Sequence, residues 1–579
     1  MASPDGCRIC AGRLELVRRG SDAQPTPDQF APANHGRGKH GDLYRCRECG
    51  TVQQPSLPGG EQLHELYRRM RDDSYLGEEQ GRRAAARRLL DKLAPHAGAG
   101  RLLDVGCGYG LFLDEARQRG YEVVGIELSS DCARYAREVL GLSVLESSLD
   151  QAGFERGSFD AIVMTDVFEH LDDPAASLDL CGELLGPDGA LMLTTPDPSS
   201  WTARLAGPRW WSYLPAHKCL VPRATVRELL LARGLVAAAE HPYVRVFSSG
   251  YWLAGLGERG GPLAACARTL SRCLPHDAML AAAMGDDWTY IVRRIEVLQP
   301  PRMLATDRGG PLKVHAVIPA HNAERTIARV AQALPVEAID RALVVDDASS
   351  DGTIPAALAA GLEVLPHPVN RGYGANQKSC YVRAALDGAD IVVMVHGDNQ
   401  YDPVLVPEMT RKIEEGQADV VIGSRLLQDE AIAGGMPRWK WIGNRALTEV
   451  ENVGFRRNFS EYHTGYRAFS MRFLRSIAFL RNSDGFAFDQ EIFAQIVASE
   501  TRVRELAIPT RYFLEASSVS FRESVRYGLR TLLILFRFRR DPRRQRWPLL
   551  RRPAVSLRPR LAPEVQASTV RATEAALEP

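Results

Sequence analysis

The chain has 579 residues, which is more than one hydrophobic core usually serves, since domains typically hold roughly 100–200 residues. Its composition of 45% hydrophobic and 25% charged residues is ordinary for a globular protein, and a formal net charge of +1 provides no general field for nucleic acid or acidic partners. No apolar run of about 18 residues predicts a membrane-spanning helix, and the first residues lack the pattern of a secretory signal. We therefore expect two large domains with smaller accessories.

Two CxxC pairs open the chain, formed by Cys7 with Cys10 and by Cys46 with Cys49. Four thiolates suit tetrahedral zinc, and a site filled by four protein ligands leaves no position for a catalytic water. The total of eleven cysteines is odd, and the other seven lie in apolar surroundings, which favours reduced thiols over a disulfide framework. The pattern predicts a structural zinc ribbon over residues 1–56 of a cytoplasmic protein, although four unrelated cysteines are the alternative.

The rest of the chain divides into two runs of alternating strand and helix signals. Residues 57–98 carry apolar side chains at helical spacing and predict a helical connector. Alternation covers residues 99–298 and resumes over 312–518, after a polar linker with Pro and Gly at 299–311. The alternation predicts two doubly wound, Rossmann-like α/β domains with parallel sheets. Residues 541–579 lack apolar periodicity and predict a disordered tail.

A glycine-rich turn begins the first α/β run. Leu102–Gly110 predicts a buried strand that leads through three glycines into a helix, and Glu127 ends the next strand. The glycines let the backbone approach a ligand, and a carboxylate about 20 residues later accepts both hydroxyls of a ribose. Nicotinamide sites and S-adenosylmethionine sites share these features.

Three more features separate the two kinds of site. They are Asp104 directly before the glycines, the segment Phe159–Leu171 and the segment Leu185–Pro196. Together, over about residues 101–240, they resemble class I S-adenosylmethionine-dependent methyltransferases, and the preceding cysteine module resembles such enzymes from sugar-modifying and surface-polysaccharide pathways. The resemblance implies S-adenosylmethionine as cofactor. The residues it places around that cofactor and the transfer site are Asp104, Gly106, Gly108, Gly110, Glu127, Asp166 and Phe168.

His170 is the candidate general base of this half. It follows Glu169 on a loop that leaves a strand, and a neutral imidazole accepts a proton near neutral pH. The alternative is that these two residues cap the next helix. The aromatic residues that either cover the methyl acceptor or belong to the core are Trp201, Trp210, Trp211, Tyr213 and His217.

The second α/β run contains five features in a fixed order. They are Val314–Glu324, Ala342–Thr353, Asn370–Gly374, Ile391–Pro403 and Val420–Arg425. Carboxylates follow two of the predicted strands, at the edge where open α/β sheets bind ligands. Over about residues 312–521 the order resembles the inverting family-2 glycosyltransferases, which include polyprenyl-phosphate sugar synthases. The resemblance implies a GT-A fold, a nucleotide-sugar donor, Mg²⁺ or Mn²⁺, and a glycan or polyprenyl-phosphate acceptor.

The resemblance also assigns a task to each motif. Asp398 matches the last carboxylate of the DxD motif, Gln400 matches a metal ligand of the polyprenyl-phosphate branch, and His396 replaces the usual first aspartate. Imidazole suits manganese better than magnesium. Asp489 and Glu491 stand where many members place a catalytic base, and helix caps or arginine partners are the alternative. The residues expected at the nucleotide-sugar are Pro319, Ala320, Glu324, Asp346, Asp347, Asn370, Gly372, Gly397, Arg425 and Arg438.

Residues 519–540 predict a basic amphipathic helix, which either lies on an anionic membrane or packs on the second domain with solvated arginines. No aromatic stacking platform accompanies the basic residues, so no nucleic-acid partner is expected. The sequence predicts a bifunctional cytoplasmic enzyme of glycan or cell-surface polysaccharide assembly, peripheral at the inner face of the membrane if the helix binds lipid. The alternatives are a methyltransferase half that acts on an unrelated small molecule, and a ligand-binding scaffold with one inactive half.

Overall fold

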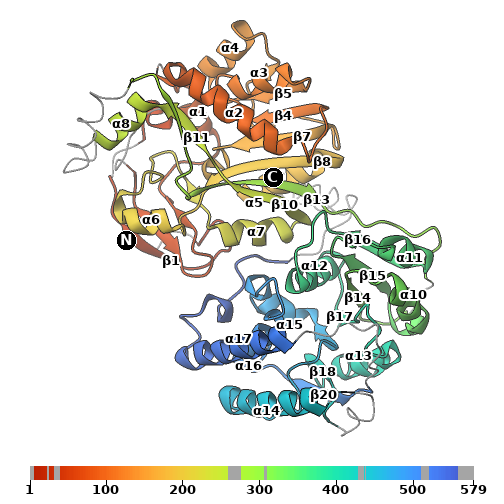
Figure 1. Cartoon of the computed structure of the whole chain (residues 1–579). Coiled ribbons are helices and arrows are strands. Elements are labelled where there is room, and N and C mark those ends of the chain that lie inside the picture. Colours follow the sequence, from red (N-terminus) through yellow and green to blue (C-terminus); the bar gives the residue numbers. More distant parts are fainter. Residues whose placement is uncertain are drawn as a thin grey trace, which may run out of the picture. The chain divides into compact units, whose positions relative to one another are not determined.

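The computed structural model describes residues 6–21, 25–31, 40–72, 74–257, 275–304, 309–427, 436, 438–509 and 521–557. The chain divides into two compact units, Met1–Arg294 and Ile295–Pro579 (Figure 1). Among the residues described, no helix combines the length and apolar character needed to cross a bilayer.

A seven-stranded sheet in the order β10-β13-β8-β7-β4-β5-β6 forms the centre of the N-terminal unit. Its strands are β4 (Arg101–Val105), β5 (Glu122–Ile126), β6 (Val144–Leu145), β7 (Phe159–Thr165), β8 (Leu185–Pro196), β10 (Leu235–Pro242) and β13 (Asp287–Arg294). The strands from β8 to β6 are parallel, whereas β13 and β10 are antiparallel to their neighbours. The doubly wound α/β fold is confirmed, and the sheet departs from the parallel arrangement expected only at this edge, where β13 and β10 run antiparallel.

Eight α-helices are described in this unit. They are α1 (Gly60–Arg68), α2 (Glu79–Leu93), α3 (Leu111–Gln118), α4 (Ser130–Glu138), α5 (Pro174–Leu184), α6 (Trp201–Ala206), α7 (Arg223–Leu231) and α8 (Ser249–Gly257). Helices α2 and α3 contribute to the core around the sheet. Strands β11 (Arg245–Ser248) and β12 (Met279–Ala282) form a separate pair. The segment predicted as a connector supplies α1 and α2, and Leu89, Leu90 and Leu93 of α2 belong to the buried core. It is therefore part of the domain that it precedes.

The cysteine-bearing segment forms a four-stranded sheet in the order β1-β2-β3-β9. Its strands are β1 (Leu14–Arg18), β2 (Leu43–Cys46), β3 (Val52–Gln53) and β9 (Cys219–Leu220). Val52 pairs with Leu220, so the last strand comes from far along the chain. The ribbon expected over residues 1–56 is thus completed by the larger α/β fold.

The C-terminal unit has a seven-stranded mixed sheet in the order β16-β15-β14-β17-β19-β18-β20. Its strands are β14 (Val314–Ala320), β15 (Arg341–Asp346), β16 (Glu363–Pro366), β17 (Ile391–Met394), β18 (Val420–Ser424), β19 (Arg467–Ser470) and β20 (Val503–Ala507). Only β19 is antiparallel to both neighbours, which again departs from the parallel sheet expected. Strands β14, β15 and β17 are almost fully buried apolar runs, as expected of strands covered on both faces.

Eight helices are described around this sheet. They are α10 (Glu324–Ala333), α11 (Thr353–Ala359), α12 (Tyr373–Leu386), α13 (Val406–Glu414), α14 (Arg438–Phe455), α15 (Met471–Ser476), α16 (Phe488–Ala498) and α17 (Phe521–Arg540). The basic helix predicted from the sequence is α17.

Residues 541–557 are ordered, so the prediction of disorder is wrong for this part of the tail. The Asp541 carboxylate accepts hydrogen bonds of 2.9 Å from the backbone N–H groups of Gln545, Arg546 and Trp547. Leu549 is buried, and its carbonyl accepts a hydrogen bond of 3.0 Å from Gln495 of α16. A polar cap and a few apolar side chains therefore fix a segment without helical periodicity. The remainder of the predicted tail, 558–579, lies outside the described residues.

Candidate functional sites

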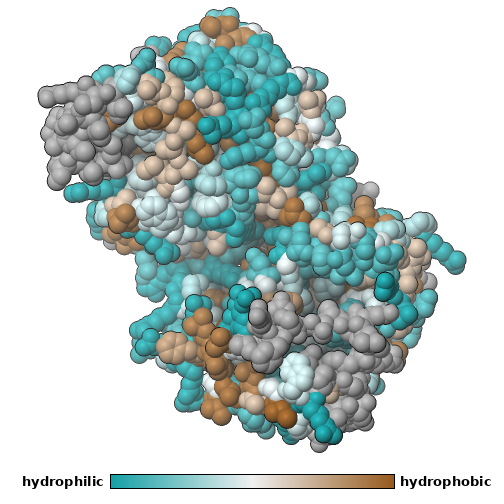
Figure 2. Space-filling model, viewed as in Figure 1, coloured by the Kyte–Doolittle hydropathy of each residue, from teal (hydrophilic) through white to brown (hydrophobic). Residues whose placement is uncertain are grey.

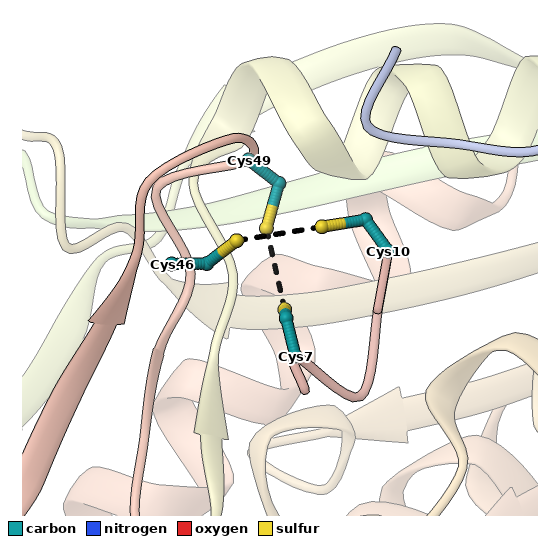
Figure 3. A group of neighbouring side chains, drawn as sticks. All are labelled: Cys7, Cys10, Cys46 and Cys49. Carbon is teal, nitrogen blue, oxygen red and sulfur yellow. Dashed lines mark hydrogen bonds between the residues drawn. The ribbon is translucent and has the colours of Figure 1, made fainter. Parts of the chain in front are cut away.

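The four cysteines of the two CxxC pairs converge at one point (Figure 3). The Sγ atoms of Cys7 and Cys49 lie 3.5 Å apart, and those of Cys10 and Cys46 lie 3.4 Å apart. All four sulfur atoms lie within 4.8 Å of one another, and three of the four residues are buried. This arrangement fits one tetrahedral zinc ion held by four thiolates, with no open ligand position.

The three glycines of the turn after β4 have different surroundings. Gly106, Gly108 and Gly110 all have positive φ, at 69°, 54° and 81°. A Cβ atom on Gly106 or Gly110 would come within 2.7 Å of a neighbouring side chain, so these two glycines permit close packing. A Cβ atom on Gly108 would meet only the Tyr75 hydroxyl, at 3.9 Å. Gly108 therefore leaves space beside the turn where a ligand can approach the backbone.

Two buried carboxylates lie beside this turn. Glu127 accepts hydrogen bonds of 2.8 Å from the backbone N–H groups of Gly108 and Ser129. Burial raises the pKa of Glu127, and burial followed by the charge of Glu127 raises the pKa of Asp104. Each Glu127 oxygen receives one backbone hydrogen bond and keeps a second lone pair for hydroxyl donors.

The loop after β7 contains two predicted site residues, Asp166 and Phe168, which differ in exposure. Asp166 is half-exposed, has a positive φ of 55° and lies 3.8 Å from Arg245. Phe168 is fully buried, so its ring belongs to the core of the domain. The alternative in which Glu169 and His170 cap the next helix is not what the structure shows, because Asp173 caps α5 through the N–H groups of Ala175 and Ala176.

His170 instead belongs to a buried polar cluster. Its Nδ1 lies 2.8 Å from the Tyr67 hydroxyl and 3.0 Å from the Ala216 carbonyl. The rings of His170 and His217 are 4.9 Å apart, and His217 Nε2 lies 3.9 Å from the Glu169 carboxylate. Burial, followed by the charge of His217, lowers the pKa of His170 to about 3, and burial lowers that of His217 to about 4. Both rings are therefore neutral at neutral pH.

The tautomer of His170 follows from its partners. A carbonyl oxygen only accepts, so Nδ1 carries the proton and donates it to Ala216, which leaves the Nε2 lone pair available. Glu169, His170 and His217 also have ligand atoms within 4.8 Å of one another, which is close enough for all three to contact one metal ion.

The aromatic residues of this unit have different surroundings. Trp210 is buried and its indole N–H donates to Asp286 at 2.7 Å, so it belongs to the core, whereas Trp201 is exposed. Sequence reasoning missed Tyr67 and Tyr75, which lie in the segment taken for a connector. Their only signal was an aromatic residue within a basic, helical stretch, and that signal does not indicate a site.

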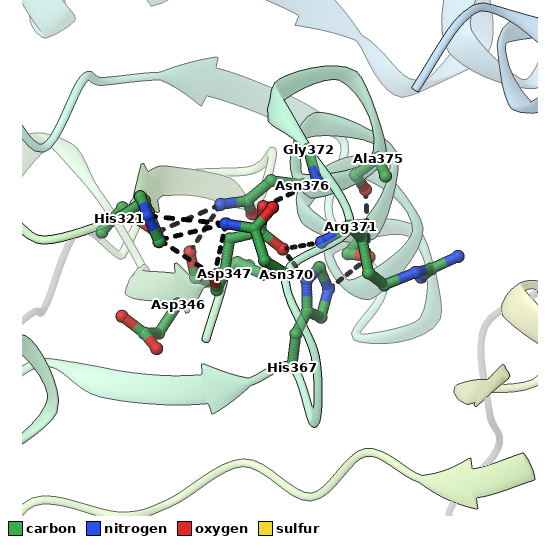
Figure 4. A network of polar contacts seen from close by, with 12 residues as sticks. His321, Asp346, Asp347, His367, Asn370, Arg371, Gly372, Ala375 and Asn376 are labelled. Carbon is green, nitrogen blue, oxygen red and sulfur yellow. Dashed lines mark hydrogen bonds and ion pairs between the residues drawn. The ribbon is translucent and has the colours of Figure 1, made fainter. Parts of the chain in front are cut away.

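In the C-terminal unit, the end of β15 is joined to the turn before α12 (Figure 4). Asp347 accepts hydrogen bonds from His367 Nδ1 at 2.8 Å, from the Arg371 N–H at 2.9 Å and from the Gly372 N–H at 2.8 Å. Burial opposes ionisation of Asp347, but the hydrogen bonds from His367 and Arg371 outweigh it and lower its pKa. Asp346 is fully buried and accepts from the N–H and hydroxyl of Ser349.

The side chains of His321 and Asn370 both contact the backbone carbonyl of Asp347. Nδ1 of His321 lies 3.0 Å from the Asp347 carbonyl, and the Asn370 side-chain amide donates to that carbonyl at 3.2 Å. His321 is exposed and was not selected as a site residue from the sequence, although it lies within the Val314–Glu324 motif, directly after β14. His367 also contacts the Ser379 hydroxyl at 2.8 Å, but both residues are buried, so this chain of contacts positions Asp347.

The segment after β17 holds the predicted metal ligands. Asp398 is half-exposed and accepts from the Gln400 N–H at 3.1 Å. His396 Nε2 is buried and makes no hydrogen bond with any described residue. A buried nitrogen of this kind is suited to bind a metal ion or, when it carries a proton, to donate a hydrogen bond to a phosphate oxygen. A Cβ atom on Gly465 would lie 2.1 Å from this nitrogen, so the glycine makes room for the imidazole.

Other predicted residues support this site through the backbone. A Cβ atom on Gly397 would lie 3.2 Å from the Pro319 carbonyl and 3.4 Å from Ala320, so the ends of β14 and β17 approach closely. Thr326 donates to the Gly397 carbonyl at 2.6 Å. Glu324 accepts from the Gly352 N–H at 3.1 Å, which links the starts of α10 and α11.

The two arginines expected at the phosphates have different positions. Arg425 is buried, pairs with the buried Glu461 and donates to the His463 carbonyl at 2.8 Å. Its guanidinium therefore orders the loop before β19, and we do not assign it to phosphate binding. Arg438 is exposed at the first residue of α14.

The two acids at the start of α16 have distinct partners. Asp489 accepts from the Tyr373 hydroxyl at 3.0 Å, from Gln377 at 3.2 Å and from Arg467. The Tyr373 ring lies 6.1 Å from that of His396, so Asp489 is linked to the predicted metal side of the sheet. Glu491 instead accepts from the Ser483 N–H, and burial raises its pKa.

Comparison with known families gives one match within each of the two structural units. Residues 78–240 match the family described as Methyltransferase domain, and residues 315–479 match Glycosyl transferase family 2. The chain carries a methyltransferase domain followed by a family 2 glycosyltransferase domain. The families predicted for the two halves are confirmed, and so is the α/β fold class. The roles of the individual residues stay predictions.

Known relatives match parts of the chain. It is 39% identical over 109 residues to a ubiquinone biosynthesis O-methyltransferase of Xanthomonas oryzae pv. oryzae, which covers 17% of this chain and 44% of that protein. It is 28% identical over 200 residues to uncharacterized protein MJ1222 of Methanocaldococcus jannaschii, with 34% of this chain and 82% of that protein covered. The chain thus spans less than half the length of the O-methyltransferase relative.

Solved structures with detectable likeness include glucosyl-3-phosphoglycerate synthase from Mycobacterium tuberculosis in complex with Mn²⁺, uridine-diphosphate and glucosyl-3-phosphoglycerate. The identity is 18%, the alignment covers 39% of this chain and 80% of that chain, and the TM-score is 0.31. The same synthase with uridine-diphosphate alone gives a TM-score of 0.33 at 18% identity, with the same coverage of 39% and 80%.

Proposed function

We propose that the chain is a bifunctional transferase of glycan or cell-surface polysaccharide assembly. Its methyltransferase domain transfers a methyl group from S-adenosylmethionine, and its glycosyltransferase domain transfers a sugar from a nucleotide-sugar with inversion. One shared observation carries the proposal. In each domain a carboxylate at the carboxyl end of a parallel strand is hydrogen-bonded to a glycine turn, Glu127 to Gly108 and Asp347 to Gly372. Open α/β sheets bind ligands at this edge.

In the methyltransferase domain the cofactor supplies an electrophilic methyl group on a sulfonium. Glu127 would accept the ribose hydroxyls, and Gly108 provides the space for the cofactor beside the backbone. His170 is the proposed base, because its Nε2 lone pair is available and its Nδ1 is held by Tyr67 and Ala216. With the cofactor bound as methyl donor, His170 would take the proton that the acceptor atom loses when it is methylated.

In the glycosyltransferase domain Asp398, His396 and Gln400 fit a divalent cation, because His396 Nε2 lacks a hydrogen-bond partner among described residues and Asp398 is accessible. Mg²⁺ or Mn²⁺ would neutralise the charge of the diphosphate leaving group. Asp346 and Asp347 are the proposed contacts to the nucleoside. Asp489 is the proposed base for a hydroxyl acceptor, whereas the phosphate of a polyprenyl-phosphate acceptor is already ionised and needs none.

The proposal includes a structural zinc ion on Cys7, Cys10, Cys46 and Cys49. It also places the protein in the cytoplasm, with access to acceptors at the inner face of the membrane. A second candidate keeps the sugar transfer but lets the methyltransferase domain act on an unrelated small molecule. The similarity to a ubiquinone biosynthesis O-methyltransferase favours this second candidate, since ubiquinone is not a glycan.

Turnover tests the proposal directly. The purified chain would be incubated with common nucleotide-sugars and Mn²⁺ or Mg²⁺, and the release of nucleoside diphosphate would be measured with glycan and polyprenyl-phosphate acceptors. Formation of S-adenosylhomocysteine would be measured with the products of that reaction as acceptors. We expect metal-dependent sugar transfer and methylation of the same product. Binding of both donors by titration calorimetry without any turnover would contradict the proposal and identify a scaffold.

A further inference from the structure

Two helices of the C-terminal unit expose an unusual amount of apolar surface. Helices α14 and α17 pack on each other, and the rings of Phe455 and Phe538 lie 4.9 Å apart. Yet each helix has large apolar side chains on its exposed side (Figure 2). We call this surface the α14/α17 patch. Its large residues are Trp439, Ile442, Val450, Val453, Leu529, Leu532, Leu533 and Phe536.

Helix α17 has two apolar faces. Thr531, Ile534, Leu535 and Phe538 are buried against the protein. At 3.6 residues per turn, Leu529, Leu532, Leu533 and Phe536 lie on the opposite side of the helix, and Leu529 is 64% exposed. Packing of α17 on its own domain therefore accounts for one face only.

Helix α14 repeats the pattern. Thr448, Glu451, Asn452 and Phe455 are buried, while Trp439, Ile442, Val450 and Val453 form an exposed stripe. Val453 is 74% exposed. A contiguous exposed apolar patch of this kind marks an interaction site, whereas apolar residues scattered singly over a surface need no partner.

The charged residues beside the patch indicate what kind of partner it binds. Between residues 526 and 540 the exposed cations are Arg526, Arg530, Arg537, Arg539 and Arg540, and this segment contains no acidic residue. Helix α14 adds the exposed Arg438 and Arg445 and one exposed acid, Glu449, so the charge beside the patch is predominantly positive. An apolar stripe flanked by arginines, with aromatic residues among the apolar ones, is the composition of a helix that lies at the surface of an anionic bilayer. A symmetric contact with a second copy of the chain would instead bring the arginines of both copies together.

We propose that the α14/α17 patch docks the protein on an anionic lipid bilayer, with the apolar side chains in the interface and the arginines at the lipid phosphates. The contact involves two helices of the folded domain, whereas the sequence indicated only residues 519–540.

The inner face of α17 contacts the segment His463–Arg467, whose sequence resembles the acceptor-side loop of family 2 glycosyltransferases, and this step rests on the proposed function. The Tyr527 hydroxyl lies 3.3 Å from His463 Nδ1 and accepts from Gln490 Nε2 at 2.6 Å. His463 begins the segment that resembles the acceptor-side loop, and Gln490 is the neighbour of Asp489. A bilayer on the outer face of α17 would therefore bring a membrane-borne acceptor to the helix that supports this loop.

Vesicle sedimentation tests the proposal without using turnover. The full chain would be mixed with vesicles of equal parts phosphatidylglycerol and phosphatidylcholine, and separately with vesicles of phosphatidylcholine alone. We expect salt-sensitive binding to the anionic vesicles. Leu532→Ser combined with Phe536→Ser should weaken it at least about tenfold, because two apolar side chains leave the interface. Arg537→Gln combined with Arg539→Gln should weaken it by a similar factor on anionic vesicles only.

The matched control is Val139→Ser combined with Leu205→Ser, which removes two exposed apolar side chains from the N-terminal unit, one of them 81% exposed. It should leave vesicle binding unchanged, and all variants should keep the thermal unfolding temperature of the parent. Equal binding by the parent and both patch variants would overturn the proposal. So would a concentration-dependent dimer in sedimentation velocity that the patch variants abolish, because the patch would then bind a second copy. Neither result would bear on whether the domain transfers sugar.

Discussion

Arg467 Nη1 donates a hydrogen bond of 2.9 Å to the Asp489 carboxylate, and only 1% of the arginine is exposed. The pair links β19 to the start of α16. A buried cation without its partner carries a large desolvation cost, so this contact makes Asp489 a structural and a candidate catalytic residue at once. Glu491, two residues later, contacts neither this arginine nor Tyr373 through any hydrogen bond between described residues.

Asp489→Asn should reduce sugar transfer to a hydroxyl acceptor by at least about a hundredfold, the scale of a lost general base. Glu491→Gln should reduce it no more than a few-fold, although it too lies on α16. Nucleotide-sugar affinity by calorimetry and the unfolding temperature separate catalysis from folding, since a merely structural role would change both. Full activity of Asp489→Asn together with an inactive Glu491→Gln would assign the base to Glu491 instead.

Asp398→Asn should also reduce sugar transfer at least about a hundredfold, because the amide keeps the shape but removes the charge opposite the cation. We expect the cation of the proposed site to depend strongly on this residue, since His396 replaces the other carboxylate of the motif. His396→Asp should tighten Mg²⁺ relative to Mn²⁺. Metal titrations of transfer rate measure both effects, and Asp402→Asn on the same loop is the control, with a change of a few-fold at most. Near-normal transfer by Asp398→Asn would exclude the metal-assisted mechanism.

Glu127→Ala should weaken S-adenosylmethionine at least about tenfold, since it removes two charge-assisted hydrogen bonds, each worth roughly 1.5–3 kcal/mol. Nucleotide-sugar affinity should not change, because the glycosyltransferase domain has its own core. Calorimetric titration measures both. The control is Glu146→Gln, a surface carboxylate just after β6. An unchanged affinity for the cofactor would show that Glu127 does not bind the ribose.

Cys46→Ser should abolish the zinc content of roughly one ion per chain, measured by elemental analysis. The variant should also lower the unfolding temperature of the methyltransferase domain, because β9 of that domain pairs with β3 of the ribbon. Cys380→Ser, in the other domain, should keep its zinc. Retention of the full zinc content by Cys46→Ser would refute the site.

The methyltransferase domain should lose stability as the pH falls from about 6.5 toward 4. The folded pKa values of His170 and His217 are depressed, to about 3 and about 4, whereas an unfolded histidine titrates near about 6.5. Below pH 6.5 the unfolded chain binds more protons, so each buried histidine lowers the free energy of unfolding by up to about 1.4 kcal/mol per pH unit. Thermal unfolding of His217→Gln should be less steeply pH-dependent than the parent, unlike the exposed control His276→Gln. Equal slopes would contradict this origin.

The sequence by itself determined the division into two domains, the family of each and the cysteine module. These depend on local patterns, namely glycine turns after apolar runs, carboxylates at strand ends and CxxC spacing, which one stretch of chain encodes without reference to the rest. The mixed sheets were not visible, because a strand signal does not state its direction relative to neighbours it meets only after folding.

Tertiary structure alone decided which side chains share a site. Tyr67 reaches His170 from a helix about a hundred residues away, and Arg425 pairs with the buried Glu461. The ordered segment 541–557 and the exposed stripe of α14 also depend on packing against helices elsewhere in the chain. Burial and pairing are properties of neighbours in space, and the free energy that fixes them arises only when distant segments exclude water together.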